Sequence, residues 1–280
     1  MRNRFAAIVL LVLAMVCVAA YAAPVPKAQP FKPGCTLPFD AIAQRNLPID
    51  DGRCLAGGNA NAAPPNGKNQ KAQNEAKNNF CAPAPAVDLA QADFVDLQAA
   101  AVAQHIPFGG ESQLPPDRTK LVKLSKTAGG TEIGEGTQVR FVAFVDKAHY
   151  SDVDKGESVN CNIPGESTND IHIPLLQTKT GSECDSVTAE MSPHMRPAFW
   201  TPANLNRLGV PVRVTGQLFF DAAHKPCKNG TGSPARVSLW EIHPVYAFDV
   251  CKQAEIGQCR AEQENDWVSL TQWVHDHPAH

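Results

Sequence analysis

The sequence lacks several features that would assign it quickly to a class of protein. Its formal net charge is −3 at pH 7, so it has no surplus of lysine and arginine for bulk binding to nucleic-acid phosphates. It has no C-x-x-C pair, which argues against a zinc ribbon or a thioredoxin-like motif. It also has no H-E-x-x-H motif, no G-x-S-x-G motif and no phosphate-binding glycine loop. No common catalytic motif therefore indicates an activity.

Long apolar runs are also absent beyond the amino terminus, so the sequence predicts no transmembrane segment in the mature chain. At the amino terminus, Arg2 and Arg4 precede an apolar run that ends near Ala20, and the small-x-small sequence A-Y-A follows just before Pro24. This pattern predicts a secretory signal peptide over residues 1–22 and a secreted or periplasmic protein after its cleavage.

The cysteines fit an oxidising compartment. Cys17 lies in the predicted signal peptide, and an even number of cysteines follows it, which predicts disulfide stabilisation. The sequence does not choose the pairing, although a local Cys251–Cys259 bridge and a Cys54–Cys81 bridge are conceivable. The cysteines after the signal are Cys35, Cys54, Cys81, Cys161, Cys184, Cys227, Cys251 and Cys259.

Composition divides the remaining chain into five parts. The stretch near residues 57–80 is rich in Asn, Ala, Gly and Lys and poor in large apolar residues, which predicts a mobile loop or linker. The expected parts are an irregular region (23–56), a low-complexity loop or linker (57–87), a helix and its connection (88–120), a β-barrel (121–252) and a C-terminal extension (253–280).

One helix is expected before the barrel, over residues 88–104. Asp88 is the predicted cap, with Gln91 in the capping-box position. Ala90, Phe94, Leu97 and Ala101 share one face at helical spacing. This pattern is typical of a helix that packs against a core.

From residue 121 onward the pattern indicates strands. Three strands are followed by a short helix over 201–209, with Thr201 as its cap and Gly209 as its end, and then by two more strands. A second short helix is expected near the C-terminus, with Trp267, Leu270 and Val274 on one side. The five expected strands cover residues 137–146, 169–178, 185–192, 210–221 and 235–250.

This element order predicts a mainly β protein. Its centre is a five-stranded barrel like the oligonucleotide/oligosaccharide-binding fold, or OB-fold, with a short helix between strands 3 and 4. A loop-rich N-terminal region with one helix precedes it. The sequence pattern "NDIHIPL … VTAEM … VRVTGQLFFD … SLWEIHPV" resembles that of a group of secreted bacterial OB-fold-like proteins. The resemblance implies the barrel and no particular chemistry.

Alternation along residues 169–176 assigns the two faces of strand 2. Ile171, Ile173 and Leu175 are expected to point into the barrel, which turns Asp170 and His172 outward. The same alternation in strand 3 turns Glu190 outward. A one-residue slip would expose the isoleucines and bury the acid and the histidine, so the register should be firm.

OB-folds bind ligands on the outer face of strands 2 and 3, between the loops that here cover residues 147–168 and 221–235. We therefore expect a binding module whose ligand is a glycan, an oligonucleotide or an envelope component, with no cofactor. The candidate ligand-binding residues are His149, Tyr150, Asp170, His172, Glu190 and His224.

Two other functions and one structural interpretation compete with this hypothesis. Imidazoles and carboxylates on neighbouring strands could hold a divalent metal such as zinc or manganese, as in a hydrolase or nuclease. A structural or envelope-interaction protein could use residues 57–80 as a tether. Equally, the outward acids and histidines could be solvated or form weak cross-strand pairs, and Trp200 and Trp240 are expected in the core. The candidate metal ligands are Asp170, His172, Glu190, Glu241 and His243.

Overall fold

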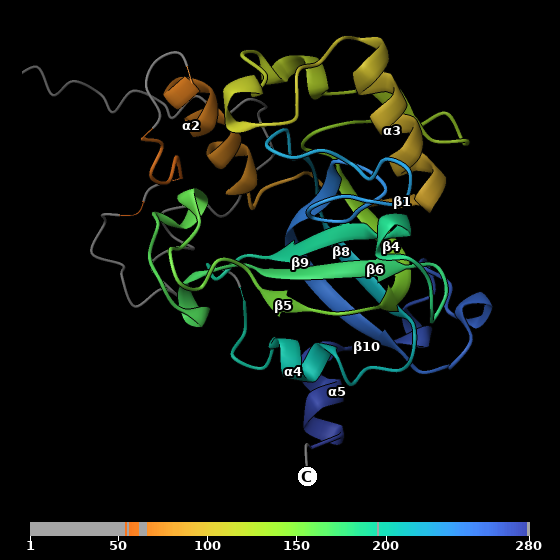
Figure 1. Cartoon of the computed structure of the whole chain (residues 1–280). Helices are drawn as coiled ribbons and strands as arrows, with labels where there is room; N and C mark the ends of the chain where they lie inside the picture. The colour runs from red at the N-terminus through yellow and green to blue at the C-terminus, as the bar shows by residue number, and fades with distance from the viewer. Residues whose placement is uncertain (1–53, 55, 62–65, 195, 279–280) are drawn as a thin grey trace, which may run out of the picture.

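A closed five-stranded barrel forms the centre of the structure, which is a computed structural model (Figure 1). It describes residues 54, 56–61, 66–194 and 196–278. The predicted signal peptide (1–22) and nearly all of the irregular region (23–56) lie outside the described residues. The barrel strands are β4 (Gln138–Val145), β6 (Ile171–Leu176), β7 (Val187–Met191), β8 (Val212–Phe220) and β9 (Trp240–Cys251).

The pairing of these strands is that of an OB-fold-like barrel. Their order around the barrel is β4, β8, β9, β7 and β6, and β6 closes the circle by pairing with β4. All of these pairs are antiparallel except β7 with β9. The helix α4 (Pro202–Leu205) lies between β7 and β8 in the chain, and the Thr201 side chain accepts a hydrogen bond from the Asn204 N–H at its start. The predicted fold class and the predicted cap are confirmed.

Short strands extend the barrel at its edges. β1 (Val87–Leu89) runs parallel to β4, β5 (His149–Tyr150) pairs with β6, and β10 (Trp267–Ser269) pairs with β9. A separate two-stranded sheet joins β2 (Ser125–Lys126) to β3 (Glu132–Ile133). Short 3-10 turns connect these elements at η1 (Glu111–Gln113), η2 (Arg118–Leu121), η3 (Ser158–Asn160), η4 (Glu166–Thr168), η5 (Glu183–Asp185), η6 (Ile256–Gln258) and η7 (Glu264–Asp266).

Helix α3 (Gln91–Ala103) forms where a helix was predicted, but its start differs. Phe94, Leu97 and Ala101 are fully buried, as their spacing predicted. Asp88 is not the cap, because it belongs to β1 and its carboxylate pairs with Arg140 on β4. Asp93 takes the capping role and accepts a hydrogen bond from the Ala90 N–H.

Helix α2 (Asn66–Lys77) occupies the segment that was predicted as a loop or linker, and that prediction is wrong for these residues. Polar contacts hold the helix in place. The Asn74 amide donates to the Gly57 carbonyl at 3.1 Å, and the Gln217 amide of β8 donates to the Ala76 carbonyl at 2.8 Å. A segment without large apolar residues is thus held in a helix by buried amide contacts.

Three disulfides lie within the described residues, namely Cys54–Cys161, Cys184–Cys227 and Cys251–Cys259. Cys81 is also disulfide-bonded. The conceivable Cys54–Cys81 bridge is therefore wrong, because Cys54 is joined to the loop before β6. The local bridge at the end of β9 is confirmed.

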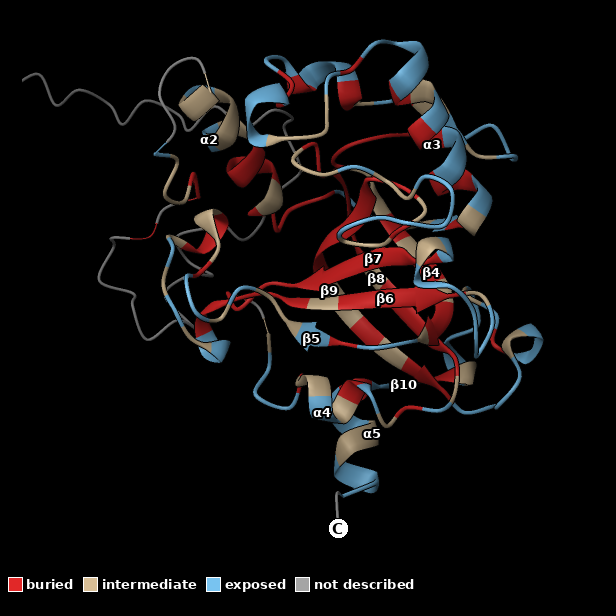
Figure 2. Ribbon diagram, viewed as in Figure 1, coloured by how far each residue is buried: buried red, intermediate tan, exposed pale blue. Residues whose placement is uncertain are grey.

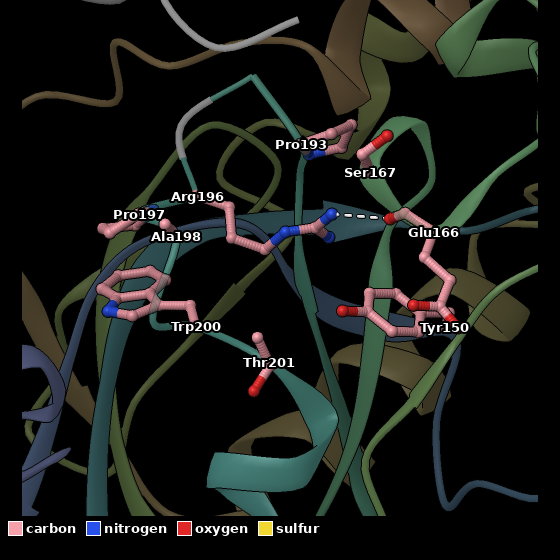
Figure 3. A pocket seen from close by; sticks show the side chains of 9 residues that line it. All are labelled: Tyr150, Glu166, Ser167, Pro193, Arg196, Pro197, Ala198, Trp200 and Thr201. Carbon is pink, nitrogen blue, oxygen red and sulfur yellow. Dashed lines mark hydrogen bonds between the residues drawn. The ribbon is translucent and has the colours of Figure 1, made fainter.

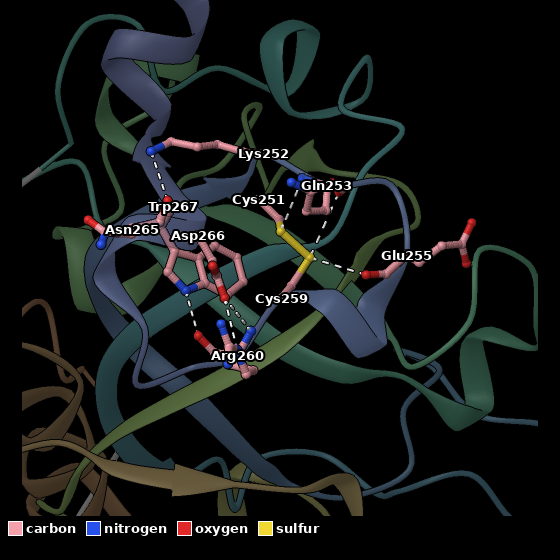
Figure 4. The surroundings of a disulfide bond; sticks show 9 residues. All are labelled: Cys251, Lys252, Gln253, Glu255, Cys259, Arg260, Asn265, Asp266 and Trp267. Carbon is pink, nitrogen blue, oxygen red and sulfur yellow. Dashed lines mark hydrogen bonds and ion pairs between the residues drawn. A yellow bond between two sulfur atoms is a disulfide. The ribbon is translucent and has the colours of Figure 1, made fainter.

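The C-terminal extension packs back onto the barrel around the Cys251–Cys259 disulfide (Figure 4). The Trp267 indole donates to the Arg260 carbonyl at 2.8 Å. Trp267 belongs to β10, which pairs with β9, and not to the predicted helix. That helix begins three residues later and is α5 (Leu270–Asp276). Among all the helices described, none combines the length and the apolar character that crossing a bilayer requires.

The core fills the barrel interior and extends under α3 (Figure 2). Ile171, Ile173 and Leu175 of β6 are at most 1% exposed, which confirms the predicted inner face. Trp200 and Trp240 belong to the same core, as expected. At Gly216 in β8 a Cβ atom would lie 2.5 Å from the Pro244 carbonyl oxygen, so this close approach of β9 requires glycine.

We expect Ile173→Ala to lower the free energy of unfolding by about 2–5 kcal/mol, because it leaves a cavity in a closed barrel. Val102→Ala, on the exposed side of α3, is the control and should change it by less than about 0.5 kcal/mol. Denaturant unfolding of the oxidised chain measures both values. Equal losses for the two variants would contradict the assigned faces of β6.

Candidate functional site

The polar side chains on the outer face of β6, β7 and β9 are buried, not solvated. Asp170, Glu190, Glu241 and His243 are each at most 1% exposed. The interpretation of these groups as solvated surface residues is therefore wrong. The alternation correctly turned them away from the barrel interior, but α2 and the loop 147–168 cover this part of the barrel.

Carboxylates and imidazoles alternate in one connected cluster at this place. His243 lies between two acids, with Nε2 3.5 Å from Asp170 Oδ2 and Nδ1 2.5 Å from Glu190 Oε2. The other oxygen of Glu190 lies 3.2 Å from His172 Nε2, which is also 3.4 Å from Glu157 Oε1. The barrel sets this arrangement, because His172 and Glu190 are direct cross-strand partners and β9 runs beside β7.

Residues from the covering segments complete the cluster. Lys77, the last residue of α2, places its ammonium nitrogen 3.4 Å from Glu190 Oε2. Glu157 accepts a hydrogen bond from the Asp170 N–H at 3.0 Å, and the Asn160 amide donates to Asp170 Oδ1 at 2.9 Å. The Cys54–Cys161 disulfide lies directly after Asn160 and ties the loop 147–168 to a residue that precedes α2 in the chain.

A second group of charges lies at the end of β8. Asp221 accepts from the Arg236 guanidinium at 3.0 Å, and Arg236 also pairs with Glu241. The Nδ1 atom of His224 is 2.5 Å from the same Asp221 carboxylate, while 41% of the His224 side chain is exposed. Asp221 is thus a buried acid that holds a partly exposed imidazole.

Some residues of each group line one polar cavity of about 420 Å³, which we call the central pocket. Amide side chains from α2, including Gln73 and Asn74, form part of its wall. No phenylalanine, tyrosine or tryptophan lines it. The charged and titratable residues that we use to define the central pocket are Lys77, Glu157, His172, Glu190, Asp221 and His224.

The candidate ligand-binding residues do not all meet in the central pocket. His172, Glu190 and His224 line it, and Asp170 lies behind Glu190 and His172. His149 pairs with His172 across β5 and β6, with 5.6 Å between ring centroids, but it is exposed and not part of the lining.

Tyr150 belongs to a different hollow of about 720 Å³ (Figure 3). There the Arg196 side chain lies between Trp200 and Tyr150 and donates to the Glu166 carbonyl at 2.8 Å. Side chains at neighbouring positions on a strand point to opposite faces. His149 therefore lies beside His172, while Tyr150 lines the other hollow.

Charge interactions shift the pKa values in the cluster in opposite directions. Burial by itself lowers the pKa of His172, but the carboxylates of Glu190 and Glu157 outweigh it and raise that pKa to about 9. Burial raises the pKa of Asp170 to about 6, with Glu157 adding to the effect. Burial and the nearby Glu190 charge also raise the pKa of Glu241 well above its usual range.

The remaining acids stay ionised. Burial would raise the pKa of Glu190, but His172, Lys77 and His243 hold it well below its usual range. Burial would likewise raise the pKa of Asp221, which His224, Lys77 and Arg236 lower instead. Lys77 gains from the same contacts, because Glu190 raises its pKa against the effect of burial.

Within the part of the chain that the structure describes, two sets of three residues have the donor atoms and the spacing to hold a metal ion. In each set the donor atoms lie within 4.8 Å of one another, and Glu190 belongs to both. Glu157, His172 and Glu190 face the central pocket, while Asp170, Glu190 and His243 are fully buried. Glu241, the remaining candidate metal ligand, belongs to neither set and pairs with Arg236.

Comparison of the chain with protein-family models, with curated proteins and with solved structures finds no match. The resemblance to secreted bacterial OB-fold-like proteins therefore stays a prediction, while the barrel itself is observed. Function has to be argued from the site alone.

Sequence reasoning missed three parts of the site. Lys77 lies in the segment predicted as a linker, and Glu157 lies in a loop without a strand pattern. Arg236 precedes β9 in the chain. Its pairing with Asp221 and Glu241 can be recognised only in the folded barrel. The one available signal was Asp221, an acid directly after the apolar end of β8 with a histidine three residues further on.

We expect Arg236→Met to lower the free energy of unfolding by about 3–5 kcal/mol, because it leaves Asp221 and Glu241 buried without their cation. The matched control is Arg260→Met, which removes an exposed pair with Asp266 and should cost less than about 1 kcal/mol. Equilibrium unfolding in urea compares the two. Similar small losses would mean that the buried network is not coupled to folding.

The raised pKa of His172 predicts a stability that falls with pH. The imidazolium faces Glu157 and Glu190, with Lys77 and His149 nearby. Its favourable contribution is complete below the unfolded value of 6.5 and is lost as pH rises through about 9. Between pH 7 and pH 9.5, chelator-treated protein should lose about 1–3 kcal/mol of unfolding free energy.

The control for this pH dependence is His172→Gln, whose stability should change less over the same range because the titrating group is gone. Both proteins are unfolded in denaturant at closely spaced pH values. Parallel curves for the two proteins would contradict the assignment of the titration to His172.

Proposed function

We propose that this protein is an exported binding module that takes a small, hydroxyl- or amine-rich glycan fragment in the central pocket. The observation that carries the proposal is the convergence of Glu157, His172, Glu190, Asp221 and His224 on one cavity of about 420 Å³. A concave site with several convergent polar groups and shifted pKa values is the usual form of a binding site.

The position of the cavity supports the same proposal. It lies over the outer face of β6 and β7, which correspond to strands 2 and 3 of the OB-fold-like barrel. Proteins with this fold bind oligonucleotides and oligosaccharides on that face. The loops predicted to frame it contribute Glu157 from residues 147–168 and His224 from residues 221–235.

The lining favours a glycan over an oligonucleotide. Nucleic-acid binding on OB-folds depends on aromatic rings that stack on bases and on positive charge for the phosphates. The lining of the central pocket holds no Phe, Tyr or Trp, and it has no surplus of positive charge, because its carboxylates outnumber Lys77, its one lysine. Carboxylates and amides instead match hydroxyl and amine donors.

Export is part of the proposal and is supported by the covalent structure. The disulfides Cys54–Cys161, Cys184–Cys227 and Cys251–Cys259 fit an oxidising compartment such as the periplasm or the extracellular space. The basic and apolar amino-terminal pattern predicts the same route.

A hydrolase is the second candidate, favoured by the Asp221–His224 pair. A buried carboxylate that orients an imidazole leaves the second ring nitrogen available for proton transfer. His224 lines the same pocket as Glu157, His172 and Glu190, which offer donor atoms for a metal. Binding and turnover of one glycan class would then share one site.

The proposal predicts that neutral and amino-sugar oligosaccharides bind the full chain while oligonucleotides do not. His224→Gln should weaken glycan binding at least about tenfold, because it replaces the imidazole that Asp221 holds at the pocket wall. The control is His275→Gln, an exposed histidine near the C-terminus, which should bind like the wild type. Calorimetry against a panel of both ligand classes measures this.

Glycan binding that is unchanged in His224→Gln, or binding of oligonucleotides alone, would contradict the proposal. Release of shorter glycans over time by the wild type, and its loss in His224→Gln, would support the hydrolase instead.

A further inference from the structure

The set formed by Glu157, His172 and Glu190 has the composition of a metal site that is open to a pocket. Two carboxylates and one imidazole converge from the loop 147–168, β6 and β7, with His172 Nε2 3.4 Å from Glu157 and 3.2 Å from Glu190. Imidazole with carboxylate suits zinc, manganese and similar divalent ions. The set faces the central pocket, so further coordination positions are available to water or a ligand.

Buried polar atoms without hydrogen bonds surround Glu190 and give an independent observation. His243 is fully buried and lies between Glu190 and Asp170, with Nδ1 2.5 Å from Glu190 Oε2 and Nε2 3.5 Å from Asp170 Oδ2. Asp170 Oδ2 and Glu241 Oε2 lack hydrogen-bond donors. Buried polar atoms are almost always satisfied, so two buried carboxylate oxygens without a hydrogen-bond donor beside this cluster agree with a bound cation.

The balance of fixed charge agrees with this. Arg236 is committed to Asp221 and Glu241, which leaves Lys77 as the permanent cation next to Glu190. Two ionised carboxylates at the pocket, those of Glu157 and Glu190, therefore face one permanent cation.

We propose that the central pocket binds one divalent cation, Mn²⁺ or Zn²⁺, through Glu157, His172 and Glu190. His243 and Asp170 act behind it as positioning residues that orient Glu190. The cation deepens the proposed function, because it lies in the pocket assigned to the glycan and can bind vicinal hydroxyl groups there. Of the five metal ligands predicted from the sequence, this assignment keeps His172 and Glu190.

Lys77 gives the proposal a distinctive consequence. Its ammonium group lies 3.4 Å from Glu190 Oε2 and competes with the cation for the same carboxylate. Lys77→Gln removes this competing charge and should tighten cation binding roughly fivefold or more. A variant that merely damaged the structure would weaken binding.

The test uses full-length protein without an affinity tag, treated with chelator and then titrated with Mn²⁺ or Zn²⁺ alone in a calorimeter. The wild type should bind one equivalent. Glu157→Gln and His172→Gln should each weaken binding about tenfold or more. These residues are preferred to Glu190, because Glu157 and His172 keep some solvent exposure and their variants are better tolerated.

Two controls separate this site from others. His149→Gln changes the exposed neighbour of His172 and should bind like the wild type. The double variant His275→Gln, His277→Gln removes histidines of the C-terminal tail and should also bind like the wild type. Unfolding curves of each variant show that it is folded before titration.

Equal affinity of the wild type and His172→Gln would overturn the proposal, as would loss of binding in the tail variant or unchanged affinity in Lys77→Gln. The metal titration contains no glycan, and the glycan panel is repeated on chelator-treated protein. A missing cation site and a missing glycan site are therefore separate results.

Discussion

The burial of Glu190 is the constraint on which the rest of this structure depends. Its carboxylate is 1% exposed and meets His172, His243 and Lys77, which come from β6, β9 and α2. An ionised carboxylate removed from water costs several kcal/mol unless opposite charge surrounds it. The barrel register, the end of α2 and the loop carrying Glu157 all have to be in place for that charge to be compensated.

The covering segments are polar because the face that they cover is polar. Helix α2 has almost no large apolar residues, yet Gln73 to Ala76 are buried. The Asn74 side-chain amide donates to the Gly57 carbonyl, and the Gln217 amide of β8 donates to the Ala76 carbonyl. The Cys54–Cys161 disulfide holds the preceding chain near η3. An apolar helix in this position would remove Lys77 from Glu190 and leave the Gln217 amide without the Ala76 carbonyl that it bonds, and unpaired buried polar groups are costly.

A buried charge network of this kind contributes less to the free energy of unfolding than apolar cover could, since well-packed apolar residues of similar size are often more stabilising. Charged groups held in a cavity against this cost are typical of sites that bind or react. The proposed cation and glycan would use this arrangement directly. Glu190 belongs to both sets of possible metal ligands, and the Asp221–His224 pair lines the same pocket.

The sequence by itself determined the barrel, because period-two alternation and caps are local patterns: Ile171 and Ile173 face inward, and Thr201 caps α4 where it was predicted. It also placed Glu190 and His243 together among the candidate metal ligands on neighbouring strands. Only the tertiary structure decided that this face is buried, that α2 exists, and that Tyr150 belongs to another hollow. Those outcomes depend on contacts between residues far apart in the chain, such as Lys77 with Glu190, and no local pattern records them.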